Sequence, residues 1–417
     1  AWAYTILTDE GMLTAEVGRG TYVARARPAG LMDGGLDMPL EVDSTKHQSD
    51  AQTYHVNLIS PHLPSVGQAE LIRQLLAEVA YDPPSGMMHY PTRHGSASAR
   101  RAAAQWISSP PLGEVKEDDL VLAHGGQNAI LLIFQTLLSG RRPVILVEEL
   151  SYPGFRRAAE LLRAHVVPVA MDAQGVIPDA FEAAAKTHGA QILCTSPEVH
   201  NPTCGFSPEA RRRALVDVAR KHDVQIMEDD CYRMGTARAP SYRVLAPERS
   251  WYVTSISKTL TPALRIGLAV APKGQAAGLR RASEHSFFGL ATPMIDLCAK
   301  LLTHNKLDGL VTHVRRANNA YVEAAVNILG GYDLKWQKDV PFLWLHLPDG
   351  WRAGAFAQAA EGVGVRIRIA EEYACRDART PHAIRFAINA GVSLESFEKA
   401  IGRLRDLLEN PQDQIGV

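Results

Sequence analysis

The sequence contains no run of eighteen or more apolar residues, so we expect no membrane-spanning helix. It also lacks an excess of either charge: the formal net charge is -1, which predicts no global attraction to nucleic acid or to anionic lipid. The five cysteines form no C-x-x-C pair, and the fifteen histidines show no H-E-x-x-H or clustered spacing. We therefore expect no metal site. With no signal segment in the sequence either, a reducing cytoplasm is the predicted compartment.

The chain does contain a regular alternation of short apolar runs and helical patterns. "DDLVLAHGG" precedes "NAILLIFQTLLSG", and "RPVILVEE" precedes "PGFRRAAELLRA". Such alternation predicts an α/β fold with a mainly parallel sheet covered by helices on both faces. After about Ala299 a long helical stretch leads into the apolar runs "FLWLHLP", "VGVRIRI" and "AIRFAIN". Because 417 residues exceed one simple core, we expect a large domain over 57–299 and a smaller α+β domain over 300–417.

The most specific stretch is "SISKTLTPALRIG", which directly follows an apolar run. Ser255 and Ser257 project from one face of an extended segment, and Lys258 follows at its end, where open α/β sheets place their ligands. Arg265 can return across the following turn. Two hydroxyls and a guanidinium suit a phosphate dianion, and a lysine beside them is the nucleophile that forms Schiff bases with carbonyl compounds.

This stretch resembles the lysine signature of the class I/II aminotransferases, which depend on pyridoxal 5'-phosphate (PLP) and share the aspartate-aminotransferase-like fold, fold type I. The resemblance implies a seven-stranded, mainly parallel sheet in the large domain and a Schiff base between Lys258 and PLP. It extends from about residue 57 to 408, with further motifs in the family's order.

Two of these motifs concern the cofactor's phosphate and ring. "HGGQNAI" opens an apolar helix whose N-terminus can bind phosphate, and the resemblance assigns Gly126 and Gln127 to that contact. On its own this motif is equally a glycine turn before a helix. Tyr152 in "ELSYPGF" matches the aromatic residue that lies on the pyridine ring.

Two further motifs concern the polar atoms of the ring. Asn201 in "HNPTCGF" matches the asparagine that binds the phenolic oxygen, although Cys204 stands where the family usually has glycine. If that position needs a positive φ, cysteine is strained there, and we expect Gly205 to take over the turn. In "MEDDCYRM" the resemblance assigns Asp229 to the pyridine nitrogen and Tyr232 to the phenolic oxygen.

The remaining motifs concern the substrate and a second subunit. In "MHYPTRHGSASAR" the resemblance assigns Tyr90 to the phosphate of the neighbouring subunit, which implies a homodimer with composite active sites. Arg385 in "HAIRFAIN" matches the arginine that binds the substrate α-carboxylate, with Asn201 beside it. Three further arginines are candidate ligands for a second substrate carboxylate: Arg352, Arg366 and Arg368. The ordinary expectation for such residues is that they are solvated charges on the surface.

The first residues resemble a different family. "AYTILTDEGMLTAEVGRGTYVARA" is similar to the end of the winged-helix domain of GntR-type regulators, whose wing carries a G-R-G-T-[FY]-V signature with Arg19 at its tip, facing DNA. A GntR winged helix joined to an aminotransferase-like domain defines the MocR-type regulators. The resemblance therefore implies a winged-helix remnant over 1–23 and a linker or arm over 24–56. DNA would be contacted only through an upstream winged helix. A simple hairpin of an enzyme is the alternative.

Three functions remain open at this point. The first is transamination between an amino acid and a 2-oxo acid through Lys258, with Asp229 and Tyr232 as its other catalytic residues. The second is a transcription regulator whose aminotransferase-like domain senses PLP or an amino acid without turnover. The third is another fold type I reaction, such as that of a β-lyase.

Overall fold

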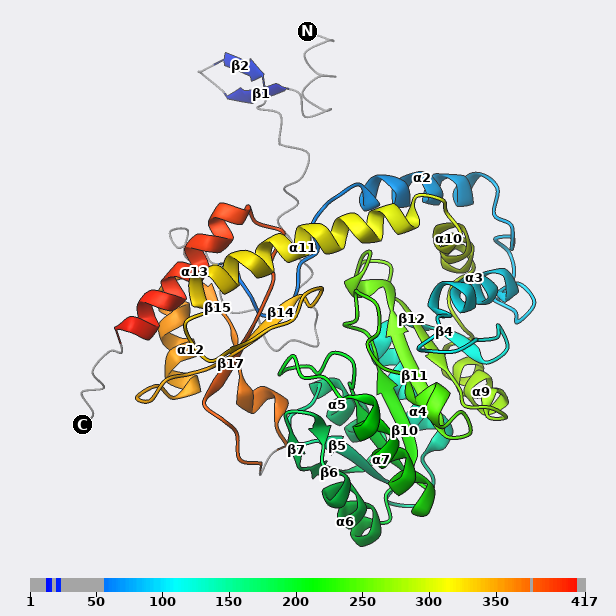
Figure 1. Cartoon of the computed structure of the whole chain (residues 1–417). Helices are drawn as coiled ribbons and strands as arrows, with labels where there is room; N and C mark the ends of the chain where they lie inside the picture. The colour runs from blue at the N-terminus through cyan, green and yellow to red at the C-terminus, as the bar shows by residue number, and fades with distance from the viewer. Residues whose placement is uncertain (1–12, 17–19, 24–55, 376–377, 411–417) are drawn as a thin grey trace. The chain divides into compact units, whose positions relative to one another are not determined.

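The computed structural model describes residues 13–16, 20–23, 56–375 and 378–410 (Figure 1). The chain divides into two compact units, 1–53 and 54–417. In the first unit, β1 (Leu13–Glu16) and β2 (Gly20–Val23) form an antiparallel hairpin. A hairpin therefore lies where the wing was predicted, and its assignment to a winged helix stays a prediction. Arg19 and most of the predicted linker lie outside the described residues.

A seven-stranded sheet forms the centre of the second unit, in the order β4-β12-β11-β10-β9-β5-β6 (Figure 1). Its strands are β4 (Leu120–His124), β5 (Val144–Glu148), β6 (His165–Val169), β9 (Ile192–Thr195), β10 (Gln225–Asp229), β11 (Ser250–Ser255) and β12 (Ile266–Val270). Strand β12 pairs antiparallel with both β11 and β4, and the other pairs are parallel. The predicted mainly parallel sheet of seven strands is confirmed.

Successive strand residues pack into different apolar clusters because side chains alternate between the two faces of a sheet. In β11, Trp251 and Val253 belong to one cluster, while Tyr252 belongs to another. All three are at most 1% exposed, which explains why the strands read as continuous apolar runs. The helices around this sheet are α2 (Gln68–Tyr81), α3 (Ala97–Ile107), α4 (Gly125–Leu137), α5 (Pro153–Leu161), α6 (Pro178–His188), α7 (Glu209–Lys221), α8 (Tyr242–Leu245), α9 (Ala276–Phe287) and α10 (Thr292–Leu302).

A second, four-stranded sheet has the order β13-β14-β17-β16. Its strands are β13 (Leu334–Lys335), β14 (Phe342–His346), β16 (Arg368–Ile369) and β17 (Ala383–Ala387), and the helices that follow the large sheet are α11 (Leu307–Leu329), α12 (Ala353–Gly362) and α13 (Leu394–Glu409). These three helices share one apolar cluster with β14 and β17. The predicted long helix is α11, which is visible in Figure 1. The boundaries predicted between the domains stay predictions.

The run "VGVRIRI", expected as one strand, is two. Strand β15 (Val365–Arg366) pairs with β3 (Val56–Asn57), whereas β16, one residue later, pairs with β17. The chain therefore moves between two sheets at Ile367, which periodicity alone could not indicate. A small hairpin of β7 (Met171–Asp172) and β8 (Gly175–Val176) completes the strands, and none of the described helices is long and apolar enough to cross a membrane.

Candidate active site

The candidate residues of the large sheet meet at the ends of its central strands. Asp229 ends β10, Ser255 ends the neighbouring β11, and Lys258 ends the short 3-10 helix Ile256–Lys258 that follows. Because β10 and β11 are adjacent and parallel, with Asp229 opposite Val253, both deliver their polar residues to one edge.

The start of α4 provides a tightly packed turn beside a guanidinium. Gly125 has φ 80°, and a Cβ placed there would lie 2.6 Å from Nη2 of Arg265. A Cβ at Gly126 would lie 2.7 Å from Sγ of Cys231. Arg265 itself has φ 52°, and its Nη2 lies 3.5 Å from the carbonyl oxygen of His124, to which it donates. A left-handed arginine costs about 1–2 kcal/mol, and such strain is typical of sites where a side chain must be aimed. Glycines, a helix N-terminus and a guanidinium together suit a phosphate.

Gln127 and Tyr152 lie beside this turn. Gln127 donates from Nε2 to the carbonyl oxygen of Gly154 at 2.9 Å, and its buried Oε1 has no hydrogen-bond partner among the described residues. Tyr152 precedes α5, and a side chain at Gly154 would overlap its ring. Gly154 thus makes the space in which the two side chains meet.

The carboxylate of Asp229 is buried, with the backbone N–H of Cys231 donating to Oδ1 at 3.1 Å. Burial raises the pKa of Asp229 to about 6, and the nearby carboxylates of Asp230 and Glu148 add to this rise. A buried acid whose pKa is raised in this way gains most from a positively charged partner, such as a protonated ring nitrogen.

Asn201 and Ser257 each present a polar atom that the protein does not satisfy. Both residues are buried, and within the described part of the chain neither Oδ1 of Asn201 nor Oγ of Ser257 has a hydrogen-bond partner. Buried polar atoms are rarely left unpaired, so a ligand bound here could supply the missing partners. The Ser257 hydroxyl, next to Lys258, can donate to a phosphate, and Oδ1 of Asn201, on the loop after β9, can accept from a donor on a ligand.

Lys258, Tyr232 and Arg385 are brought together from three different segments. Nζ of Lys258 lies 5.3 Å from the ring centroid of Tyr232. Arg385, on β17 and 2% exposed, donates from Nη2 to the Tyr232 hydroxyl at 3.4 Å. Its Nη1 also donates to the hydroxyl of Tyr373 at 2.9 Å and to the carbonyl oxygen of Ile59 at 3.3 Å. These three acceptors are neutral oxygens, so a carboxylate would be a stronger partner for the guanidinium.

Tyr90 is not part of this cluster. It is 79% exposed, and its ring contacts Phe288 with the centroids 5.5 Å apart. Arg100 of the same motif is buried and donates to the carbonyl oxygens of Glu117 and Arg93, which is a structural role.

Cys204 corrects one expectation. Gly205 does not take over the turn: Cys204 itself has φ 59°. Two hydrogen bonds hold this strained residue. The Cys204 Sγ–H donates to the carbonyl oxygen of Phe342 at 3.4 Å, and Nε2 of Gln337 donates to the carbonyl oxygen of Cys204. Burial raises the thiol pKa to about 12, so the side chain is neutral.

The three additional arginines differ from one another. Arg352 is exposed at the start of α12, and Arg366 lies 3.6 Å from the carboxylate of Glu361. Arg368 is buried on β16 opposite Arg385, so its default as surface charge is wrong, and it pairs with Glu372. This pair already neutralises Arg368.

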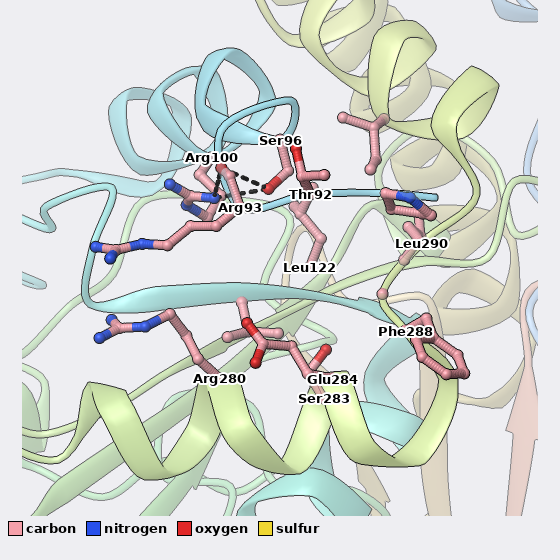
Figure 2. A pocket seen from close by; sticks show the side chains of 14 residues that line it. Thr92, Arg93, Ser96, Arg100, Leu122, Arg280, Ser283, Glu284, Phe288 and Leu290 are labelled. Carbon is pink, nitrogen blue, oxygen red and sulfur yellow. Dashed lines mark hydrogen bonds between the residues drawn. The ribbon is translucent and has the colours of Figure 1, made fainter. Parts of the chain in front are cut away.

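A cavity of about 200 Å³ lies elsewhere (Figure 2). Arg280 and Glu284 of α9 line one side, while Arg93 and Arg100 line the other, with Phe288 at one end. None of the predicted site residues lines it. The cavity is therefore distinct from the cluster around Lys258.

Sequence reasoning missed several residues of the cluster. The backbone N–H of Cys231 donates to Asp229, and Arg385 contacts Tyr373 and Phe342. Glu148 contacts His200, which precedes Asn201. The position of Cys231 two residues after Asp229 was a usable signal. The others reach the site only through the fold.

The seven-stranded sheet and the smaller sheet beside it form an α/β fold of the fold type I aminotransferases, and comparison with known proteins identifies the family. The family described as aminotransferase class I and II matches residues 64–404, and this chain belongs to it.

Its relatives include both enzymes and regulators. The 2-aminoadipate transaminase of Thermus thermophilus is 31% identical over 291 residues, which cover 66% of this chain and 70% of that protein. The HTH-type transcriptional regulator YdeF of Bacillus subtilis, itself described as uncharacterized, is 25% identical over 98% of this chain and 85% of its own length. An archaeal alanine:glyoxylate aminotransferase has the same fold, with a TM-score of 0.76 at 21% identity over 86% of this chain and 92% of that structure.

Proposed function

We propose that this protein binds PLP at Lys258 and transfers an amino group between an amino acid and a 2-oxo acid. Family membership supports transamination in general, and one observation in the structure supports these particular residues: a lysine amine 5.3 Å from the Tyr232 ring, whose hydroxyl is 3.4 Å from a buried arginine. This spacing lets one small amino acid contact both the Lys258 amine and the Arg385 guanidinium. Its carboxylate would pair with Arg385 while its Cα faces Lys258.

The residues present fit PLP. Gly126, Gln127 and Arg265, with the hydroxyls of Ser255 and Ser257, would hold its phosphate. The ring would lie against Tyr152. The Nδ2 group of Asn201 and the Tyr232 hydroxyl would donate to its phenolic oxygen, and Asp229 would bind its ring nitrogen.

When bound, PLP supplies a covalent link for the substrate nitrogen and withdraws electrons from Cα. The protein's own contribution is to hold and move protons. The Lys258 amine would act as general base and general acid: its Nζ would take the proton from the substrate Cα and hold it for return. Asp229 keeps the ring nitrogen protonated throughout.

We further propose that two copies of the chain form a homodimer in which Tyr90 reaches the other copy's cofactor phosphate. Its 79% exposure supports this role, because a large aromatic side chain and its neighbour Phe288, 68% exposed, are left uncovered in one chain. The five cysteines carry no disulfide, which supports the reducing cytoplasm as the proposed compartment.

The test is absorbance after PLP addition. Wild type should bind PLP covalently and turn yellow, and borohydride should fix the cofactor to the peptide that contains Lys258. Lys258→Ala should stay colourless after gel filtration, whereas Lys273→Ala, outside the cluster, should behave as wild type. A Lys258→Ala protein that retains a reducible, covalently bound cofactor contradicts the assignment. Conversion of the cofactor to pyridoxamine phosphate without release of ammonia indicates transamination, whereas release of ammonia with the cofactor still an aldehyde indicates a β-lyase reaction.

The second candidate is the effector domain of a MocR-type regulator. It is favoured by the match to YdeF over 98% of this chain and by the β1–β2 hairpin with its G-R-G-T-Y-V stretch. A longer protein with the complete winged helix should then bind DNA with an affinity that changes when PLP or an amino acid is added. Equal DNA affinity with and without these ligands contradicts sensing. Measured turnover by the same protein decides whether the two functions coexist.

A further inference from the structure

A carboxylate and an imidazole form a fully buried pair directly beside the loop that carries Asn201. Glu148 ends β5, and His200 immediately precedes Asn201. Their side chains are 2% and 3% exposed, and Nε2 of His200 lies 3.3 Å from Oε2 of Glu148. The same nitrogen lies 2.9 Å from the carbonyl oxygen of Leu150. An ion pair or hydrogen-bonded pair at this depth is costly to bury unless its other polar atoms are also satisfied.

The partners of Glu148 come from the neighbouring strand. The Thr195 hydroxyl donates to Oε1 at 2.7 Å, and the backbone N–H of Ser196 donates to Oε2 at 3.3 Å. These residues stand at the end of β9 and just after it, so they fix the carboxylate where the Asn201 loop leaves the sheet.

His200 in turn closes that loop. Its Nδ1 lies 2.6 Å from the Thr203 hydroxyl, its backbone N–H donates to the carbonyl oxygen of Gly205 at 3.0 Å, and its carbonyl oxygen accepts from Cys204 at 2.8 Å. Asn201 thus lies inside a turn whose ends are tied to His200. No hydrogen bond among the described residues orients Oδ1 of Asn201 directly, so the turn sets its direction.

Glu148 also acts on the other side of the candidate site. Glu148 ends β5 and Asp229 ends β10, with only β9 between these two strands in the sheet. The charge of Glu148 is the smallest of the named causes that raise the pKa of Asp229, after burial. One buried carboxylate therefore bears on both residues that we assign to the polar atoms of the cofactor ring.

We propose that His200 and Glu148 are positioning residues: together they aim the Asn201 amide at the cofactor's phenolic oxygen, and Glu148 strengthens the hold of Asp229 on the protonated ring nitrogen. This inference rests on the proposed function. Neither side chain touches the reacting atoms. Their contribution is made through Asn201 and Asp229.

Two replacements of His200 separate its two contacts. His200→Gln keeps a nitrogen near the position of Nε2, facing Glu148, whereas His200→Asn keeps one near Nδ1, facing Thr203. We expect His200→Asn to weaken PLP affinity about tenfold, because it leaves the buried Glu148 carboxylate without its imidazole partner. His200→Gln keeps that partner and loses only the neutral contact with Thr203, so it should weaken PLP affinity by about threefold. The matched control is His222→Asn, which breaks a remote pair whose Nε2 lies 3.1 Å from the Glu182 carboxylate, and which should leave PLP affinity unchanged.

A double-mutant cycle keeps the test valid even if these variants lose stability. If His200 acts through Asn201, then His200→Asn should weaken PLP binding in wild type but have no further effect in an Asn201→Ala background. Additive losses contradict the positioning role and leave a structural one.

Glu148→Gln gives a separate spectroscopic readout. Removing the negative charge should move the pH midpoint of the bound cofactor's visible band to lower pH, because the protonated form loses a stabilising carboxylate. An unchanged midpoint contradicts the electrostatic part of the inference. If wild type itself gives no visible band with PLP, the proposed function fails, whereas a normal wild-type band with unaltered variants overturns only this inference.

Discussion

Replacing Asp229 with asparagine should stabilise the cofactor-free protein at neutral pH, although we assign this residue to the cofactor site. Its pKa is about 6 in the folded protein, against an ordinary value of 3.8, because burial disfavours the charged form. The folded protein therefore holds this proton more tightly than the unfolded chain. Its free energy of unfolding falls as the pH rises from about 4 to about 6, and the loss is complete above the higher pKa.

The difference between the two pKa values sets the magnitude. It corresponds to about 3 kcal/mol at pH 7.5 and to about 1 kcal/mol at pH 4.5. Asparagine has nearly the same shape, carries no titrating proton, and its Oδ1 can still accept from the backbone N–H of Cys231, which lies 3.1 Å from the carboxylate in wild type. Asp229→Asn should therefore gain most of this free energy at pH 7.5 and much less at pH 4.5.

Urea unfolding of both cofactor-free proteins at the two pH values measures the effect. Asp349→Asn, at an exposed position, is the control and should change neither curve. Saturating PLP should reverse the order, since the Asp229 carboxylate then has its positive partner and wild type gains the greater stabilisation from the ligand. The reasoning is refuted if Asp229→Asn is stabilised equally at both pH values, or if PLP stabilises both proteins to the same extent.

Three further substitutions test other parts of the structure. Gly267→Ala would place a methyl group into the backbone that opens α4 and should lower the free energy of unfolding by at least about 2 kcal/mol in urea, whereas Gly309→Ala, with open space around it, should be nearly neutral. Arg212→Met would remove the buried guanidinium that lies 2.7 Å from the Glu198 carboxylate, while Arg238 would still pair with that carboxylate at 2.9 Å. The loss should be about 2–3 kcal/mol, and a loss under about 1 kcal/mol by calorimetry contradicts this. Cys204→Gly should be about 1 kcal/mol more stable than Cys204→Ala in urea, because both lose the thiol but only glycine relieves φ 59°, and the opposite order refutes strain at this residue.

The sequence predicts the large sheet well because its strands are buried on both faces. Apolar runs such as the one that precedes Lys258 then indicate strands without ambiguity, and polar residues that follow them fall at one edge. Lys258 and Arg265 stand out in this way, whereas Asp229 is assigned by the family resemblance, and the roles of all three stay predictions. In the small sheet the strands are short, and "VGVRIRI" was assigned to one strand where the structure has two.

Contacts between segments far apart in the chain could not be predicted. The pairing of Glu148 with His200 depends on β5 and β9 being neighbours in the sheet, which no local pattern states. The partners of Arg385 likewise come from other segments, and Cys204 takes a conformation that its residue type disfavours because Phe342 and Gln337 hold it there. Local propensity yields to tertiary contact at these positions.

The Cys204 contact has a consequence for how the two ligand sites communicate. Phe342, which accepts from Cys204, stands opposite Ala387, so the Asn201 loop is attached to the sheet that bears Arg385. A shift of this sheet toward a substrate carboxylate would be transmitted to the loop that contacts the cofactor. By thermodynamic reciprocity, an amino acid that tightens the grip on PLP must itself be bound more tightly when PLP is present. Because each ligand strengthens the binding of the other, the same fold would respond most strongly when PLP and an amino acid are both present, in an enzyme and in a regulator alike.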